Sequence, residues 1–253
     1  MPEIPHRKPQ IDPHLFPHRA AGLSGAGMKI LVVTATYTPS INGVAAVVSF
    51  QKQGLENRGH QFWVLAPHHS QQKDEKHVIR LPSLPNPFIP DYPLLLPFSP
   101  ESILSKVPHP DLIYFHHPFH IGQTGLALAR HFSVPSVFFY HTQYEFYFNT
   151  YLPSFLPRHA LAQILNRTLT KLLNQTSCII TGTESIRKQI LTMGIKPPVK
   201  VIPNFRRHIQ PVTTPIPKLR QKYHLHPTLL TLICVARLSP EKNLGTLLKL
   251  VSL

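Results

Sequence analysis

The segment KILVVTATYTPSINGV, residues 29–44, decides the fold. Its first seven residues form a continuous apolar run, which is typical of a buried strand in a parallel sheet. Residues 44–58 then place Val44, Val48 and Leu55 along one helical stripe, and Gly59 provides a residue suited to end that helix. A strand followed directly by a helix is the repeating unit of a parallel sheet.

The same alternation continues through the chain. Further strands are expected at residues 62–65, 111–115, 136–140, 178–181 and 199–202, and further helices at 122–131, at about 156–174 and from Thr183 onward. Nine prolines between residues 82 and 110 predict a long surface loop with neither a helix interior nor a central strand. The expected fold class is therefore α/β, a Rossmann-like doubly wound parallel sheet.

The composition divides the chain into four parts. Residues 1–27 hold five prolines and no apolar periodicity, which predicts a disordered Pro/His-rich extension, so that Met1 or Met28 could begin the protein. Residues 28–205 form the Rossmann-like domain, and the Pro-rich residues 206–227 form a linker. Residues 228–253 supply a strand at 228–236 and a helix at 241–253. We therefore expect a chain truncated after the first βα unit of a second domain.

The charge is the unusual feature of the composition. The 26 Lys and Arg residues against 11 Asp and Glu residues give a net charge of +15. The longest basic clusters are only pairs, such as Arg7-Lys8 and Arg206-Arg207, so the positive field is diffuse. It suits a phosphate ligand or an anionic membrane surface better than nucleic acid.

Hydropathy and cysteine usage bear on the compartment. No stretch approaches the roughly 20 apolar residues that span a bilayer. Cys178 and Cys234 each lie in an apolar run and are expected to be buried, which fits a reducing environment. The predicted location is cytoplasmic, with peripheral attachment to the inner face of the membrane as an option.

Ligands bind at the carboxyl ends of parallel strands, so the segments after the strands hold the candidate site residues. Gly43 lies at the start of a helix whose free N–H groups could bind a phosphate, although a simple tight turn explains it equally well. His141 follows a strand, with Glu145 four residues later. This pair could bind and orient an acceptor hydroxyl, or the loop could merely pack its aromatic rings.

The segment VARLSPEKN, residues 235–243, carries two cations beside the start of the last expected helix. Arg237 and Lys242 could hold a diphosphate there, or they could be ordinary surface charges. No GxGxxG motif is present, which argues against a conventional dinucleotide site.

Together these segments resemble glycosyltransferase family 4, whose GT-B fold has two Rossmann-like domains. The resemblance covers roughly residues 28–253 and rests on five segments: the first strand with PSINGV (39–44), TGTESI (181–186), VIPN (201–204), VARLSPEKN (235–243) and, for a subfamily, YHTQYE (140–145) with Tyr147 and Tyr151. The last segment is most similar to diacylglycerol glucosyltransferases and related lipid mannosyltransferases.

The resemblance implies a role for each candidate residue. Arg237 and Lys242 would hold the donor diphosphate, Gly43 would let the backbone approach the donor phosphate or the acceptor, and His141 would lie beside the reacting sugar. The acceptor side would include Asn42, Tyr144 and Glu145. The family retains anomeric configuration without a metal or a cofactor, so UDP- or GDP-hexose would enter as a substrate.

Two departures from the family pattern matter. Asn204 is followed by Phe205 and two arginines instead of glycine and an acidic residue. The family's pair of donor-binding glutamates would lie beyond Leu253.

The expected function is a retaining transfer of a hexose from a nucleotide sugar to a membrane lipid or another hydroxyl acceptor. This chain is expected to be inactive by itself, because most of the donor domain is missing. The alternative is a non-catalytic Rossmann-like module that binds an anionic membrane surface or nucleic acid.

Overall fold

The computed structural model describes residues 27–87, 91–97, 100–141, 144, 157–204, 213–226, 228–236, 238–239 and 242–251. The predicted disordered extension therefore lies outside the described residues, except for Gly27. The chain divides into two compact units, one comprising Met1–Gln143 with His159–Phe205 and the other Tyr144–Arg158 with Arg206–Leu253. Each unit is described by itself below.

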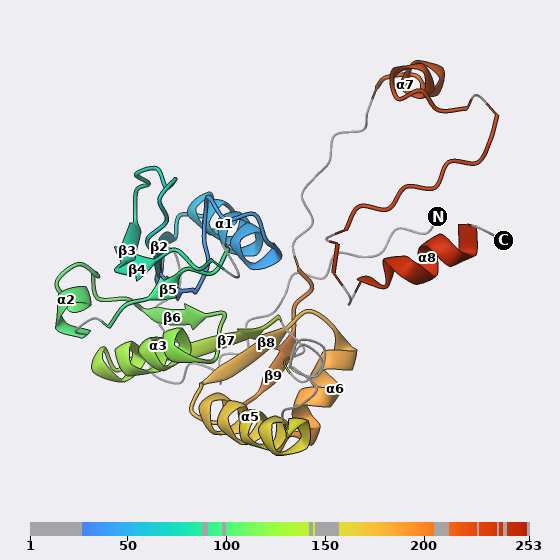
Figure 1. The fold of residues 1–253 in the computed structure, drawn as a ribbon. Coiled ribbons are helices and arrows are strands. Elements are labelled where there is room, and N and C mark those ends of the chain that lie inside the picture. The colour runs from blue at the N-terminus through green and yellow to red at the C-terminus, as the bar shows by residue number, and fades with distance from the viewer. Residues whose placement is uncertain are drawn as a thin grey trace, which may run out of the picture. The chain divides into compact units, whose positions relative to one another are not determined.

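The first unit is built on a parallel seven-stranded sheet (Figure 1). Its strands are β1 (Lys29–Val33), β2 (Gln61–Pro67), β3 (Val78–Leu81), β6 (Leu112–Phe115), β7 (Ser136–Tyr140), β8 (Cys178–Thr181) and β9 (Val199–Val201). Their order is β3-β2-β1-β6-β7-β8-β9, and every neighbouring pair is parallel. The predicted α/β doubly wound fold is confirmed.

The longer helices of the described residues that accompany the sheet are α1 (Gly43–Glu56), α3 (His120–His131), α5 (Arg158–Leu173) and α6 (Glu184–Thr192). The chain steps outward from β1 to β2 through α1, and in the opposite direction from β6 to β7 through α3. Because parallel crossovers are right-handed, these two helices lie on opposite faces of the sheet. The strand order reverses between β1 and β6, which is where ligands bind in doubly wound sheets.

The core follows the alternation of side chains along each strand. Ile30 and Val32 of β1 point toward α1, where they share a buried cluster with Val44 and Val48. Phe115 of β6 points to the other face, and its ring lies 3.1 Å from where a Cβ of Gly125 in α3 would stand. Strands that are apolar on both faces are thus buried by helices on both sides.

Two predicted helix boundaries are confirmed. The Thr183 hydroxyl accepts a hydrogen bond from the Ile186 amide at 3.3 Å, which makes it the N-cap of α6. Gly59 follows α1 with a φ of +85°, a left-handed conformation that glycine adopts without strain.

The Pro-rich segment, predicted as a long surface loop without a helix interior or a central strand, contains short regular elements. It contains a two-stranded antiparallel ribbon, β4 (Ser83–Leu84) with β5 (Leu94–Leu95), and the short helix α2 (Pro100–Leu104). Proline is tolerated at the first position of a helix, because the N–H that it lacks would be unpaired there. The edge strand β3, just before this segment, was also missed, because Arg80 interrupts its short apolar run.

The second unit departs most from expectation. Residues 213–226, predicted as linker, include the helix α7 (Ile216–Lys222). Residues 228–236 form no strand, and Cys234 is exposed, whereas both a strand and a buried thiol were expected. An apolar strand needs neighbouring strands to pair with and to cover its faces. The expected final helix is present as α8 (Leu244–Val251).

Candidate active site

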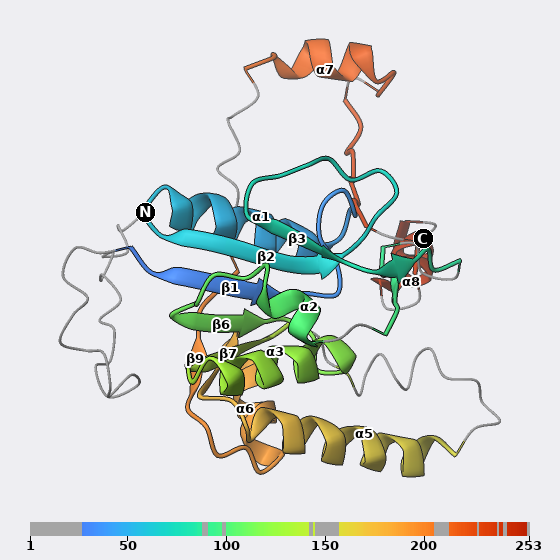
Figure 2. The same cartoon turned by 90° about the vertical axis from the view of Figure 1, so that its left-hand side faces the viewer.

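The candidate site lies at the carboxyl edge of the sheet, where the segments after β1, β6 and β7 meet. The strands run in one direction, so their arrowheads lie at a common edge (Figure 2). Thr34 and Thr36 follow β1, His116 and His117 follow β6, and His141 follows β7. All are polar residues at or beside the point where the strand order reverses.

Asn42 organises the turn between β1 and α1. Its Oδ1 accepts hydrogen bonds from the Val44 and Ala45 amides at 3.1 and 3.0 Å, which caps the helix. Its Nδ2 donates to the buried Thr36 hydroxyl at 2.8 Å. Asn42 therefore holds the loop in place.

Gly43 begins α1 without a steric need for glycine. A Cβ added there would meet nothing within 4 Å, and residue 43 is not among those with positive φ. By contrast, a Cβ on Gly122, near the start of α3, would lie 2.3 Å from the His117 carbonyl oxygen. Open space at Gly43 is compatible with close approach of a ligand to the backbone.

His141 belongs to a stack of aromatic rings on the α1 face of the sheet. Its ring stacks on Phe139 with the centroids 4.0 Å apart and on His116 at 4.8 Å. The two imidazoles also share a hydrogen bond, with His116 Nδ1 2.6 Å from His141 Nε2. Tyr114 packs its edge against His116 and accepts a hydrogen bond from Gln51 of α1 at 2.9 Å.

A hydrogen bond to His117 connects the segments after β1 and β6, the two strands between which the strand order reverses. The Ala35 amide donates to its Nδ1 at 3.1 Å, so the neutral ring carries its proton on Nε2. This contact fixes the segment after β6 against the segment after β1.

Burial keeps the three histidines neutral. It lowers the pKa of His117 to about 4 and that of His141 to about 3, in the latter case together with the nearby His117. The pKa of His116 is lowered well below its usual range by burial and by the other two rings. Neutral imidazoles can donate and accept hydrogen bonds to sugar hydroxyls, but they are poor sources of positive charge for a phosphate.

His116 and His117 were missing from the sequence-based site. The rule of inspecting the residues after each strand finds them directly after Phe115, but the aromatic segment around His141 drew attention instead. Their relation to His141 depends on the pairing of β6 with β7, which aligns Phe115 with Phe138. A pattern in one strand does not reveal that register.

The remaining predicted site residues lie in the second unit or outside the described residues. Glu145 and Arg237 lie outside the described residues. Lys242 is exposed just before α8, where its amide donates to the Ser239 carbonyl at 3.0 Å. Tyr144 and Lys242 both belong to the second unit. The roles suggested for all these residues stay predictions.

The segments after β8 and β9 also reach this edge of the sheet. The hydroxyl of the buried Thr181 has no hydrogen-bond partner among the described residues. The next residue, Gly182, lies beside the Asn204 side chain, whose Nδ2 would be 3.8 Å from a Cβ on the glycine. Within the described ranges, no group of three His, Cys, Asp or Glu side chains is arranged to hold a metal ion.

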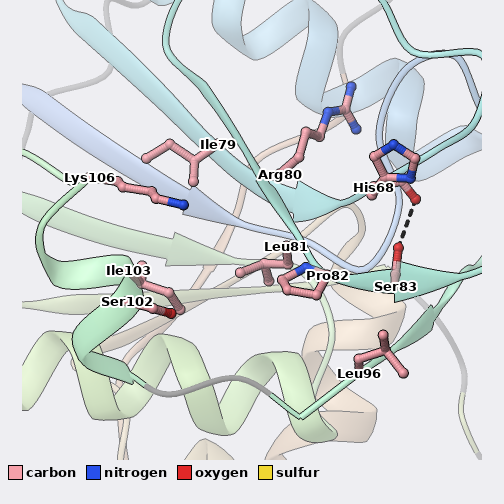
Figure 3. A pocket seen from close by; sticks show the side chains of 10 residues that line it. All are labelled: His68, Ile79, Arg80, Leu81, Pro82, Ser83, Leu96, Ser102, Ile103 and Lys106. Atoms are coloured by element: carbon pink, nitrogen blue, oxygen red, sulfur yellow. Dashed lines mark hydrogen bonds between the residues drawn. The ribbon is translucent and has the colours of Figure 1, made fainter.

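A separate pocket of about 450 Å³ lies beside the edge strand β3 (Figure 3). Aliphatic side chains, basic groups and hydroxyls line it: Ile79, Leu81, Pro82, Leu96 and Ile103; His68, Arg80 and Lys106; Ser83 and Ser102. The Arg80 guanidinium is engaged elsewhere, because it donates to the carbonyls of Thr38 and Pro67 at 2.7 and 3.1 Å. The lining is thus mostly apolar with a basic component.

Comparison with known proteins identifies the family. The model of Glycosyltransferase Family 4 matches residues 41–206. The chain is 29% identical over 236 residues to an alpha-monoglucosyldiacylglycerol synthase of Acholeplasma laidlawii, covering 88% of this chain and 58% of that protein. A synthase of the same name from Streptococcus pneumoniae is 27% identical, with 87% and 51% covered. The chain thus spans a little over half the length of these relatives.

Solved structures agree on the fold. A sucrose-phosphate synthase from Thermosynechococcus elongatus superposes with a TM-score of 0.57 at 14% identity, covering 79% of this chain and 53% of that one. The catalytic domain of starch synthase IV from Arabidopsis thaliana gives 0.53 at 14% identity, with 90% and 66% covered. These neighbours have the GT-B fold. The family model, which matches more than half of the chain, shows that the chain belongs to glycosyltransferase family 4.

Proposed function

We propose that the whole protein transfers a hexose from UDP- or GDP-hexose to a hydroxyl of a membrane lipid, with retention of anomeric configuration and without a metal or a cofactor. The observation that carries the proposal is the group of neutral histidines after β6 and β7, on the same edge of a family 4 sheet as the open first turn of α1. Hydroxyl-rich ligands are recognised by such uncharged donors and acceptors.

Each site residue takes a role in this proposal. His141 lies beside the reacting sugar, and Gly43 leaves room for the donor phosphate or the acceptor. Asn42 positions that turn, while Tyr144 and Glu145 contribute on the acceptor side. Arg237 and Lys242 neutralise the diphosphate as it leaves, and fixed cations of this kind stabilise charge that develops in a transition state.

A lipid acceptor is supported from two sides. Two relatives that match over 236 and 229 residues are named alpha-monoglucosyldiacylglycerol synthases. The first unit also presents an apolar pocket with a basic component, and the chain carries a net charge of +15, which favours an anionic membrane surface over a neutral one. None of the helices in the described ranges is long and apolar enough to span a bilayer.

The test uses the 253-residue chain beside a version extended through the second domain. Both are incubated with UDP-glucose or GDP-mannose and with mixed micelles that contain diacylglycerol or its monoglucosyl derivative. The extended protein should release nucleoside diphosphate and glycosylate the lipid, and the 253-residue chain should do neither.

Two results would contradict the proposal. If the extended protein neither binds nor consumes a nucleotide sugar, the proposed enzymatic function is wrong. If the 253-residue chain itself turns over substrate, the expectation that it is inactive alone is wrong. Binding to DNA that weakens with salt, without vesicle binding, would instead favour a nucleic-acid module.

A further inference from the structure

His116 is a buried polar residue to which neither the sequence nor the family match gives a role. It is 1% exposed, at the end of β6. Its Nδ1 contacts His141 Nε2 at 2.6 Å, and its Nε2 is buried without a hydrogen-bond partner among the described residues. A buried polar side chain normally has its hydrogen bonds satisfied, so an exception calls for an explanation.

We propose that His116 is a positioning residue that fixes His141 as a neutral imidazole with its proton on Nδ1. The proposal rests on the function proposed above, in which His141 lies beside the reacting sugar. The hydrogen bond and the parallel stacking of the two rings, 16° between their planes, together set both the orientation and the tautomer of His141.

The direction of the hydrogen bond follows from the unpaired nitrogen. Two neutral rings share one proton between His116 Nδ1 and His141 Nε2. If His141 donated, His116 would accept at Nδ1 and would bury an unpaired N–H at Nε2. If His116 donates, its buried Nε2 carries no proton and is an acceptor without a donor. Orphaned buried N–H groups are rarer in proteins than acceptors with unused lone pairs, so His116 is the donor.

The surroundings of His116 favour the neutral form. From β6 it meets the ring of Tyr114 and the neighbouring His117, and from β7 it meets Phe139 and His141. Gln51 of α1 holds the Tyr114 hydroxyl, which keeps that phenol in place. The groups that act on His116 electrostatically among the described residues are His141 and His117, both neutral at pH 7.

The consequence for His141 is a defined chemical character. With its Nε2 occupied by the hydrogen bond from His116, the ring presents only the Nδ1–H, on the side away from His116. It can therefore donate a hydrogen bond to a sugar or acceptor oxygen, but it cannot take up a proton without breaking its bond to His116. His141 would act as a fixed donor rather than as a general base.

Long-range proton–nitrogen NMR of the 253-residue chain with ¹⁵N-labelled histidine tests the proposal, because it reports which ring nitrogen carries the proton. The His141 signals are assigned by their loss in a His141→Phe variant. At pH 7 the wild-type spectrum should show His141 as a single tautomer, protonated on Nδ1. Protonation of His141 on Nε2 would overturn the proposal, and this readout needs no variant at His116.

A matched pair of variants tests whether His116 sets that tautomer. In His116→Asn the side-chain amide lies near the former Nδ1, so His141 should keep its tautomer. In His116→Gln the amide lies nearer the former Nε2, so His141 should become a mixture of tautomers. An unchanged His141 spectrum in His116→Gln, with the His117 signals intact as a check on folding, would assign His116 a packing role only.

The two proposals fail separately. The NMR experiment does not depend on turnover. If it finds His141 protonated on Nε2, the proposal for His116 is wrong, but the proposed glycosyl transfer is unaffected. If the extended protein has no transferase activity, the measured tautomer of His141 still stands, and only the role of His141 beside a reacting sugar is lost.

Discussion

The sheet of the first unit and residues 228–236 of the second unit are both apolar but are buried to very different degrees. Phe138 of β7 is fully buried, whereas Val235 is 93% and Leu230 is 86% exposed. Both regions have the composition of a strand. The difference is that β7 lies between β6 and β8, while residues 228–236 pair with no strand among the described residues. Apolar composition stabilises a strand only where neighbours can cover it.

The largest expected effect comes from removing a buried ring of the sheet. Phe138→Ala should lower the free energy of unfolding of the first unit by about 3–5 kcal/mol, because it removes a fully buried side chain and leaves a cavity. Val235→Ala should change it by less than about 0.5 kcal/mol, because the side chain is already in water. Urea unfolding followed by circular dichroism measures both. Equal losses in the two variants would show that residues 228–236 are buried in solution.

The same contrast explains what could be predicted from the sequence. Strands such as KILVVTA and SVFFY reveal themselves because burial on both faces demands a continuous apolar run. The caps at Thr183 and Gly59 are local signals and were found. The contact between His116 and His141 depends on strand register 25 residues apart, which no local pattern encodes. The prediction for residues 228–236 was wrong for the opposite reason, since their local pattern is that of a strand but no strand among the described residues pairs with them.

A glycine near the start of α3 should give the next largest effect. Gly122→Ala would place a Cβ 2.3 Å from the His117 carbonyl oxygen, and a backbone atom cannot easily move away. We expect a loss of about 1–3 kcal/mol in stability, as for overpacking elsewhere. Gly245→Ala in α8, where a Cβ meets nothing within 4 Å, is the matched control in the second unit. Unchanged thermal unfolding of Gly122→Ala would mean that α3 packs less closely than the structure indicates.

Acid should destabilise the sheet unit through its buried and half-buried histidines. In the unfolded chain a histidine has a pKa near 6.5, whereas burial lowers that of His117 to about 4. Below pH 6.5 the unfolded state therefore binds the proton first, and stability falls as the pH drops toward 4. Between pH 7.5 and 5 this amounts to about 2 kcal/mol for His117 alone.

The measurement compares urea midpoints at these two pH values. His117→Asn keeps an acceptor for the Ala35 amide but cannot titrate, so its midpoint should depend less on pH than that of the wild type. The same substitution at the exposed His224 of the second unit is the control. A variant at position 117 with the full wild-type pH dependence would show that other groups cause the acid sensitivity.

The smallest effect is expected at the N-cap of α1, where stability and function can be separated. Asn42→Ala removes the acceptor of the Val44 and Ala45 amides and should cost about 1 kcal/mol in urea unfolding. Asn243→Ala, before the exposed helix α8, should leave the unfolding of the sheet unit unchanged.

Asn42→Asp keeps the cap acceptor, and a negative charge at a helix N-terminus is favourable, so stability should be retained. If Gly43 and the first turn of α1 receive a phosphate, the same carboxylate should weaken nucleotide-sugar binding in the extended protein. Retained stability with unchanged binding would place the donor phosphate elsewhere and would leave Asn42 a purely structural cap.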